Sequence, residues 1–319
     1  MKISVALCTY NGEKYISKQL NSILNQEDYF PDEIVVCDDI SSDATLEILN
    51  KYQKKYPAVF KIIANEINLG SNKNFEKAIS LCTGDYIFLS DQDDLWKKDK
   101  IKKILAVFKQ NPLSEAVFSN ADLIDKDDKL LSTLTIWDSV FFFEKELIKP
   151  IDFIDVIAKN GNIITGATLC IKKQVKEFIF PFPTAIFHDE WIASLVALRN
   201  TISYSTENLI SYRIHDKQQV GMKNRNKLEK LDRKKRLVLG ISKPISYTDY
   251  RIVLKKYYAK IKTLNFLKAN NVNFENLESL IQKSHFDYHQ LKKEIKSKFI
   301  FQFTLNQLID KLLGKRKLK

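Results

Sequence analysis

One short group of acidic residues in this 319-residue chain has the spacing that metal chemistry requires. Asp91-Gln92-Asp93 directly follows the apolar run from Tyr86 to Leu89. Two carboxylates spaced in this way can face one hard cation together with the phosphate oxygens of a substrate. Magnesium and manganese suit such a site because they leave coordination positions for phosphate and water. The simpler interpretation is that Asp93 or Asp94 caps the helix that follows.

A second acidic group, Asp38-Asp39, ends the apolar run from Glu33 to Cys37. Carboxylates at this place could accept hydrogen bonds from a nucleobase imide or from a ribose hydroxyl. They could equally cap the next helix, together with the polar residues 41–43. The residues alone leave both interpretations open.

An alternation of apolar runs and helical patterns must position these groups. The runs predict strands at residues 3–7, 33–37, 59–64 and 86–89, and helices at 14–26, from about 42 onward, at 72–81 and through 101–108. Strands that are apolar throughout are typical of a parallel sheet with helices on both faces, an α/β fold. Ligands of such sheets bind at the carboxyl ends of the strands. The loops at 9–11, 37–39 and 90–94 are therefore expected to converge on one edge.

Beyond Pro112 the pattern is mixed. We expect strands at 116–118, 121–124, 163–171 and 209–214, and a helix at 188–198. Residues from about 222 onward are mostly helical in period and very basic.

The net charge of +12 is distributed unevenly. Residues 216–319 hold 26 basic and 9 acidic residues, whereas residues 1–215 hold 25 basic and 30 acidic ones. A protein that wraps a polyanion would be basic throughout, so nucleic acid is not the expected partner. No apolar run approaches the roughly 20 residues of a membrane-spanning helix. The first apolar run is too short for a signal peptide, and four scattered cysteines fit a reducing cytoplasm.

The motifs, in this order and spacing, resemble the nucleotide-sugar half of family 2 glycosyltransferases with the GT-A fold. The resemblance covers about residues 1–220, and the segments that carry it are 5–12, 34–39, 68–70, 84–89 and 90–96. It implies a GT-A catalytic domain at 1–221, with a nucleotide-binding half at 1–110 and an acceptor-binding half at 111–221. A basic, mainly helical extension would follow at 222–319. Neither GxGxxG nor GxxxxGK[ST] is present, which argues against dehydrogenase and P-loop functions.

The resemblance also implies a role for individual residues. The nucleotide sugar would be bound by Thr9, Tyr10, Asn11, Asp39, Asn68, Asp91 and Arg213. Asp39 would contact the pyrimidine base, and Asp91 the ribose or the sugar. Asp93 would hold Mg²⁺ or Mn²⁺, and His215 would be a second metal ligand or a phosphate donor. The metal would bridge the diphosphate and neutralise the charge that grows on the leaving nucleotide.

The family's catalytic base maps to the segment His188-Asp189-Glu190. Asp189 is the predicted base and Glu190 its rival, because this chain has His-Asp-Glu where an acidic pair is common. Both acids could instead be placed there by the dipole at the start of a helix. On the acceptor side, Gly166 would let a substrate approach the backbone. Trp191 would be a substrate platform, and aromatic packing is its other interpretation.

The expected activity is a metal-dependent, inverting transfer of one sugar to a glycan or lipid-linked glycan in surface polysaccharide synthesis. The segment from Ser90 to Trp96 is similar to that of bacterial rhamnosyltransferases, which implies dTDP-rhamnose, or else a UDP-sugar, as donor. The QxxRW motif of processive synthases is absent. One alternative is a nucleotidyltransferase acting on sugar phosphates, although residues 9–13 are neither glycine-rich nor basic. The other is a non-catalytic, membrane-associated basic scaffold.

Basic clusters flank an apolar stretch in the last third of the chain. Seven basic residues lie between Arg225 and Arg236, four more lie between Lys315 and Lys319, and the apolar stretch is at 299–303. This combination suits an anionic membrane surface. We therefore expect a cytoplasmic protein that is peripheral on the inner face of the cell membrane. A solvated appendage, or one that mediates oligomers, is the competing interpretation.

Overall fold

The computed structural model describes residues 1–140, 142, 144–146, 150–215, 237, 239, 242–272 and 274–312. The chain forms two compact units, one of Met1–Val140 with Asn162–Asn224 and one of Phe141–Gly161 with Arg225–Lys319. The predicted boundary at residue 221 lies close to the observed one. Residues 141–161, however, were expected in the catalytic domain and instead group with the C-terminal residues.

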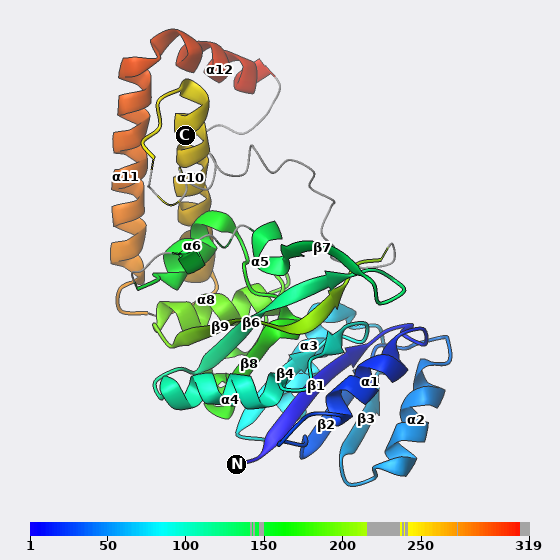
Figure 1. Ribbon diagram of the computed structural model, residues 1–319. Helices are drawn as coiled ribbons and strands as arrows, with labels where there is room; N and C mark the ends of the chain where they lie inside the picture. Colours follow the sequence, from blue (N-terminus) through cyan, green and yellow to red (C-terminus); the bar gives the residue numbers. More distant parts are fainter. Residues whose placement is uncertain are drawn as a thin grey trace. The chain divides into compact units, whose positions relative to one another are not determined.

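Nine strands form one sheet within the described part of the first unit, in the order β3-β2-β1-β4-β8-β6-β9-β5, with β7 paired to β6 (Figure 1). Their bounds are β1 Ile3–Thr9, β2 Glu33–Asp38, β3 Phe60–Ala64, β4 Tyr86–Ser90, β5 Leu95–Trp96, β6 Ala116–Ile124, β7 Leu130–Thr135, β8 Leu169–Lys172 and β9 Ile202–Arg213. The strands β3, β2, β1 and β4 are parallel, as predicted. The other half is mixed, because β8 is antiparallel to both β4 and β6 while β9 is parallel to β6.

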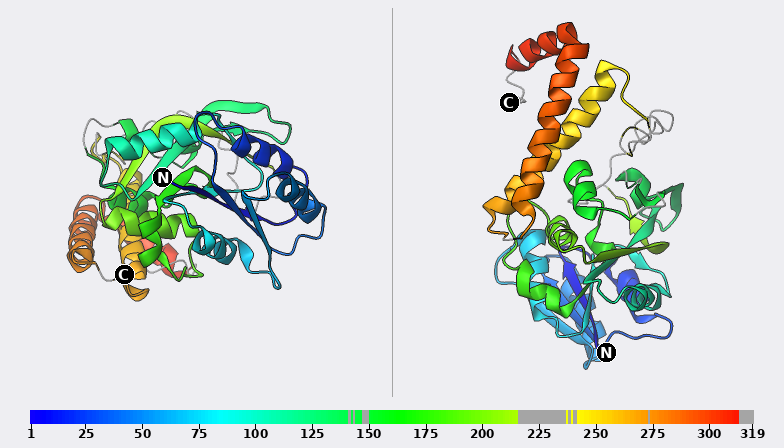
Figure 2. Two further views of the ribbon diagram at one scale, coloured as in Figure 1. Left: turned by 90° about the horizontal axis from the view of Figure 1, so that it is seen from below. Right: turned by 90° about the vertical axis from the view of Figure 1, so that its left-hand side faces the viewer.

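Helices cover both faces of this sheet. Their bounds are α1 Ile16–Leu24, α2 Thr45–Lys55, α3 Gly70–Leu81, α4 Lys100–Gln110, α5 Ile136–Ser139, α7 Lys176–Ile179 and α8 His188–Leu198, with 3₁₀ turns η2 Gly166–Thr168 and η3 Lys173–Val175. Figure 2 shows α1, α2 and α4 on one face and α3 and α8 on the other. All seven residues of β1 are buried, as a strand covered on both faces requires.

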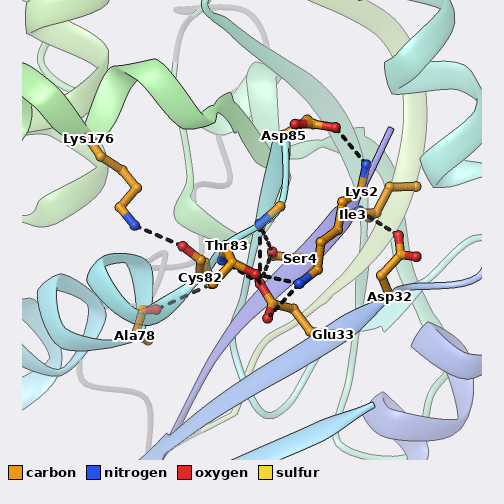
Figure 3. A network of polar contacts seen from close by, with 11 residues as sticks. Lys2, Ile3, Ser4, Asp32, Glu33, Ala78, Cys82, Thr83, Asp85 and Lys176 are labelled. Atoms are coloured by element: carbon orange, nitrogen blue, oxygen red, sulfur yellow. Dashed lines mark hydrogen bonds and ion pairs between the residues drawn. The ribbon is translucent and has the colours of Figure 1, made fainter. Parts of the chain in front are cut away.

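A polar network ties the strands together at their amino ends (Figure 3). Glu33 at the start of β2 accepts hydrogen bonds from Ser4 and from Thr83, whose Oγ1 lies 2.9 Å away. The backbone N–H of Gly84 donates to Ser4 Oγ at 2.7 Å. A Cβ at residue 84 would come within 2.5 Å of that oxygen, so only glycine permits the contact. These contacts fix the register of β1, β2 and β4, and thereby the loops at their opposite ends.

The second unit is helical. Its elements are η1 Glu144–Glu146, α6 Phe153–Asn160, α10 Tyr247–Ala269, α11 Leu277–Lys298 and α12 Ile300–Leu312. The long helices α10 and α11 lie side by side around a core of Tyr250, Leu254, Ile261, Tyr288 and Ile295 (Figures 1 and 2). None of the helices that the structure describes combines the length and the hydropathy of a membrane span.

Polar contacts explain why residues 141–161 belong to this second unit. Lys260 of α10 pairs with Asp155 of α6 at 2.5 Å, and Lys256 donates to Asn160 Oδ1 at 2.8 Å. The apolar side of α6 is buried as well, including Phe153 and Ile157. The basic clusters at 225–236 and 315–319 lie outside the described residues.

Candidate functional site

A cavity of about 380 Å³ lies in the first unit, lined by the loops that follow β1, β2 and β4 and by residues of the 162–166 segment and α8. The predicted site residues among its lining are Thr9, Tyr10, Asp39, Asp91, Asp93, Gly166, Asp189, Glu190 and His215. Four further predicted residues do not line it, namely Asn11, Asn68, Trp191 and Arg213. The structure thus brings both predicted halves of the site to one place.

The side chain of Gln92 joins two loops: the turn after β1, residues 10–12, and the aspartate loop after β4, residues 91–94. Its Nε2 donates to the carbonyl oxygen of Tyr10 at 3.0 Å, and its Oε1 accepts from the Tyr10 N–H at 2.8 Å. A Cβ at Gly12 would come within 2.2 Å of Gln92 Oε1, so a side chain there would displace Gln92 from this contact. Asn11, which was predicted to bind the nucleotide, instead accepts from the Ser42 N–H at 2.7 Å and ties this turn to the loop after β2.

Asp39 lines the cavity and also organises the start of α3. Its two carboxylate oxygens accept from the N–H groups of Leu69 and Gly70 at 2.7 and 2.9 Å, and Asn65 Nδ2 donates to Oδ1 at 2.9 Å. Asp39 therefore binds the start of α3 and does not cap the next helix, α2, as the capping interpretation expected. Its contact with a base stays a prediction. Asn68 donates to the backbone oxygen of Asp39 at 3.4 Å, which gives it a place in the loop rather than in the cavity lining.

Asp93 and His215 form the pair best placed to hold a cation. Asp93 Oδ2 lies 2.9 Å from His215 Nε2, and both side chains are 16% exposed. Nearby, desolvation and the charges of Asp93 and Asp189 raise the pKa of Asp91. A cation at this place would relieve the crowding of carboxylates.

The donor set fits a substrate-bridging metal. No group of three His, Cys, Asp or Glu side chains arranged for a metal occurs in the part of the chain that the structure describes. The protein would therefore contribute one or two ligands, and the remaining positions would be left to phosphate and water. Mg²⁺ is usually bound in this way, through one or two carboxylates and substrate phosphates.

Arg213 is a structural residue, which corrects the prediction that it binds the nucleotide sugar. Its side chain is fully buried; Nε donates to the Asp93 carbonyl at 2.6 Å and Nη1 to the Asp125 carbonyl at 2.8 Å. The guanidinium also lies 4.5 Å from the centre of the Tyr15 ring and pairs with Asp128 at 2.6 Å. It holds the backbone of the aspartate loop instead of reaching the cavity.

Asp189 is held at the start of α8 with a carboxylate suited to proton transfer. Oδ1 accepts from the Glu190 N–H at 2.7 Å and Oδ2 from the Gly166 N–H at 3.1 Å. Desolvation raises the pKa of Asp189 from 3.8 to about 7, which outweighs these hydrogen bonds. Desolvation also raises the pKa of Glu190. A base with a pKa near the working pH is the most efficient one.

Gly166 has a role that the sequence did not reveal, and Trp191 has the packing role that was the alternative to a substrate platform. A Cβ at Gly166 would come within 2.6 Å of His188 Nε2, so glycine is required by that imidazole. Trp191 is 4% exposed and donates from Nε1 to the carbonyl oxygen of Ile179 at 2.7 Å. Trp191 is therefore a packing residue of α8, which corrects its expected place on the acceptor side. Aromatic packing is the usual role of a buried tryptophan.

Lys100, the first residue of α4, contacts the 162–168 segment and the ring of Trp96. It was not identified from the sequence. It is fully buried, donates from Nζ to the Ala167 carbonyl at 2.8 Å, and lies 3.7 Å from the centre of the Trp96 ring. Burial lowers the pKa of Lys100 to about 7, although Cys170, Asp94 and Asp91 oppose this shift. The sequence around Lys100 does not distinguish it from an exposed lysine, because its only distinctive feature is that it lies four residues after Trp96.

The sequence of this chain is similar to a family of enzymes and to several of its members. Residues 4–161 match the model of the family described as Glycosyl transferase family 2. The chain is 32% identical over 236 residues to the dTDP-rhamnosyl transferase RfbG of Shigella flexneri, an alignment that covers 67% of this chain and 73% of RfbG. It is 31% identical over 221 residues to an uncharacterised glycosyltransferase of Nostoc sp., covering 67% of this chain and 65% of that relative's length.

A solved structure shows the same fold. S. aureus TarS, residues 1–349, superimposes with a TM-score of 0.53 at 19% identity, covering 93% of this chain and 83% of the other. The likeness confirms the fold class that the alternation of strands and helices predicted.

Proposed function

Because this chain belongs to glycosyl transferase family 2, we propose that it is a metal-dependent, inverting glycosyltransferase. It would move a single sugar from a nucleotide-diphosphate sugar to a glycan or lipid-linked glycan during surface polysaccharide synthesis. The observation that carries the proposal is the shared cavity, which places the Asp93–His215 pair and Asp189 on one substrate-sized space.

The proposed inverting step uses the residues of this cavity. Asp189 accepts the proton of the acceptor hydroxyl, whose oxygen forms a bond to the anomeric carbon of the donor sugar. The bond from that carbon to the diphosphate breaks on the opposite side, and the nucleoside diphosphate leaves. A bound Mg²⁺ or Mn²⁺ would supply positive charge for the leaving diphosphate. Asp93 and His215 would hold this metal, and Gln92 holds the turn at Tyr10 by a hydrogen bond to its carbonyl oxygen.

dTDP-rhamnose is the proposed donor. The name of RfbG gives that protein as a dTDP-rhamnosyl transferase, and its alignment with this chain covers two thirds of the chain. The similarity of residues 90–96 to bacterial rhamnosyltransferases points the same way. A UDP-sugar remains the second choice, since selectivity depends on loops outside the shared motifs.

A donor panel tests this proposal. With Mn²⁺ or Mg²⁺ present, the protein is expected to release nucleoside diphosphate from dTDP-rhamnose faster than from UDP-glucose or UDP-N-acetylglucosamine. Chelation of the metal should stop the release. The measurement is coupled detection of the nucleoside diphosphate, with heat-treated protein as the control. Pyrophosphate release from a nucleoside triphosphate and a sugar phosphate would instead indicate a nucleotidyltransferase, and inactivity with every substrate would favour a scaffold.

We also propose that the second unit places the enzyme on the inner face of the cell membrane. Ile300, Phe301 and Leu305 of α12 are exposed, at 64%, 74% and 45%. The sequence around them is rich in lysine, and all of the chain's excess positive charge lies in residues 216–319. Exposed apolar side chains beside basic ones bind anionic lipid surfaces by burying apolar area and by electrostatic attraction.

Neutralising the basic cluster should weaken binding to membranes. Replacement of the seven basic residues between Arg225 and Arg236 by glutamine is expected to lower cosedimentation with phosphatidylglycerol vesicles by at least about tenfold, because each cation near such a surface contributes about 1 kcal/mol. Neutral phosphatidylcholine vesicles are the control surface. Binding that is unaffected by the substitutions and by salt would contradict the proposal.

A further inference from the structure

The imidazole of His188 is a buried polar group whose nitrogens make no hydrogen bond with the described residues. Its residue is 6% exposed, and neither Nδ1 nor Nε2 has a hydrogen-bond partner in the described part of the chain. The ring is stacked on Phe75 of α3, with 3.9 Å between the ring centres and 21° between the planes. Its Nε2 occupies the space where a side chain at residue 166 would lie. Apolar contacts therefore hold the ring in one orientation.

A side chain of similar shape without nitrogens would fill this space at lower cost. A buried donor or acceptor that finds no partner loses its hydration without compensation, and proteins leave few such groups. His188 lines the same cavity as Asp91 and Asp189. A ligand in that cavity would supply the partner that the protein does not.

The charge state of His188 limits which ligand group this is. Burial lowers the pKa of the imidazole to about 3, so the ring is neutral at physiological pH. A neutral imidazole offers one N–H donor and one acceptor nitrogen. A hydroxyl group, which also donates and accepts, is its natural partner, whereas a diphosphate would favour a cation. Sugar hydroxyls are the matching chemical class.

We propose that His188 forms a hydrogen bond with a hydroxyl group of the transferred sugar and so takes part in the choice of donor. The inference rests on the proposed glycosyl transfer. The donor sugar is favoured because the proposed step puts it between Asp93, which would hold the metal at its diphosphate, and Asp189, which receives the proton of the attacking hydroxyl, and His188 lines the same cavity as both. Asp189, the next residue, is the group assigned to the acceptor hydroxyl.

The test compares binding of a complete donor with binding of its nucleotide alone. His188→Phe keeps an aromatic ring against Phe75 and removes both nitrogens. His188→Leu also removes both nitrogens, with an aliphatic side chain that is smaller than phenylalanine. Isothermal titration with Mn²⁺ present would use dTDP-rhamnose, or whichever nucleotide sugar the unchanged protein turns over, and the corresponding nucleoside diphosphate. Both variants are expected to bind the nucleotide sugar about tenfold more weakly and the nucleoside diphosphate with unchanged affinity. His188→Gln should recover part of the loss.

Ser194→Ala is the matched control. Ser194 is a fully buried residue of the same helix, its Oγ has no partner among the described residues, and it does not line the cavity. Removing this hydroxyl should leave both affinities unchanged. A thermal unfolding curve for each variant shows whether it is folded, and the leucine variant replaces the phenylalanine one if the larger ring does not fit beside Gly166.

Three results would overturn the proposal. Equal losses for the nucleotide sugar and the nucleoside diphosphate would mean a contact with the nucleotide or a general distortion of the site. A change confined to the KM of the acceptor would assign the hydroxyl to the acceptor. Unchanged binding in both variants would leave His188 as packing alone. If the unchanged protein bound and transferred no nucleotide sugar, the proposed function itself would fail.

Discussion

Replacing Asp189 by asparagine is expected to lower kcat on the order of 100- to 10 000-fold, the usual contribution of a general base, while the donor still binds. Asparagine has nearly the same shape but cannot accept the proton of the acceptor hydroxyl. The carboxylate is already oriented by the N–H groups of Gly166 and Glu190, so its loss affects proton transfer more than the shape of the cavity. Steady-state transfer rates and calorimetric donor binding measure the two effects separately.

Glu190→Gln is the matched control for this prediction. Glu190 lines the same cavity and also has a raised pKa, yet within the described part of the chain no backbone N–H donates to its carboxylate as Gly166 and Glu190 donate to Asp189. We expect its replacement to reduce kcat much less. Transfer that survives in Asp189→Asn and disappears in Glu190→Gln would reverse the assignment.

The pH dependence follows from the same carboxylate. Because the pKa of Asp189 is raised from 3.8 to about 7, the group is protonated below about pH 7 and cannot act as a base, so kcat/KM should rise with pH through that value. The sign for stability is the opposite. Between about pH 4 and 7 the folded protein keeps a proton that the unfolded chain releases, so this group makes folding less favourable as pH rises. The stability of Asp189→Asn relative to the unchanged protein should therefore increase over that interval.

Asp93→Asn is expected to remove the metal dependence of donor binding. The substitution keeps the size of the side chain and a hydrogen bond toward His215, but it removes the negative charge from the proposed cation site. Charge stabilisation by a metal is worth several kcal/mol, so kcat/KM should fall by on the order of 1000-fold. Titrations of Mn²⁺ and Mg²⁺ in the activity assay, together with donor binding at each metal concentration, provide the measurement.

Two comparison variants make this experiment specific. Asp127→Asn removes a carboxylate from an exposed turn outside the cavity and should leave activity unchanged. His215→Gln should weaken the response to metal less than Asp93→Asn, since the carboxylate carries the charge. Full metal-dependent transfer by Asp93→Asn would show that the cation, if one is used, is held elsewhere.

Periodicity in the sequence was enough to predict the first half of the fold. Continuous apolar runs at 3–7 and 33–37 became β1 and β2, and the helix expected at 188–198 became α8 with the same bounds. These elements have one strong signal each, a buried strand or an amphipathic helix. The segment at 163–171 was harder, because it divides into the 3₁₀ turn η2 and the strand β8, and its conformation depends on Lys100 and on Asp189.

The carboxyl ends of parallel strands meet at one edge, so Thr9, Asp39 and Asp91 could be predicted to lie together from the order of the strands alone. Their chemical types, and the family motif that contains them, then pointed to a nucleotide sugar. This much could be predicted because each residue follows a strand with a clear apolar run, and parallel pairing brings the ends of those strands together.

What only the tertiary structure decided is which polar residues face the cavity and which support it. Arg213 and Trp191 turn inward to pack, Gly166 makes room for an imidazole, and Gln92 clamps the first turn. Each of these roles depends on a partner far along the chain, and a sequence pattern carries no information on where such a partner stands. The sequence motifs by themselves determined the family and its parallel sheet, because each motif follows a strand with a strong apolar signal. The metal that the acidic spacing suggests stays a prediction. The packing of α3, α8 and the 162–168 segment decided that Asp189 and His188 line the same cavity as Asp39 and Asp91.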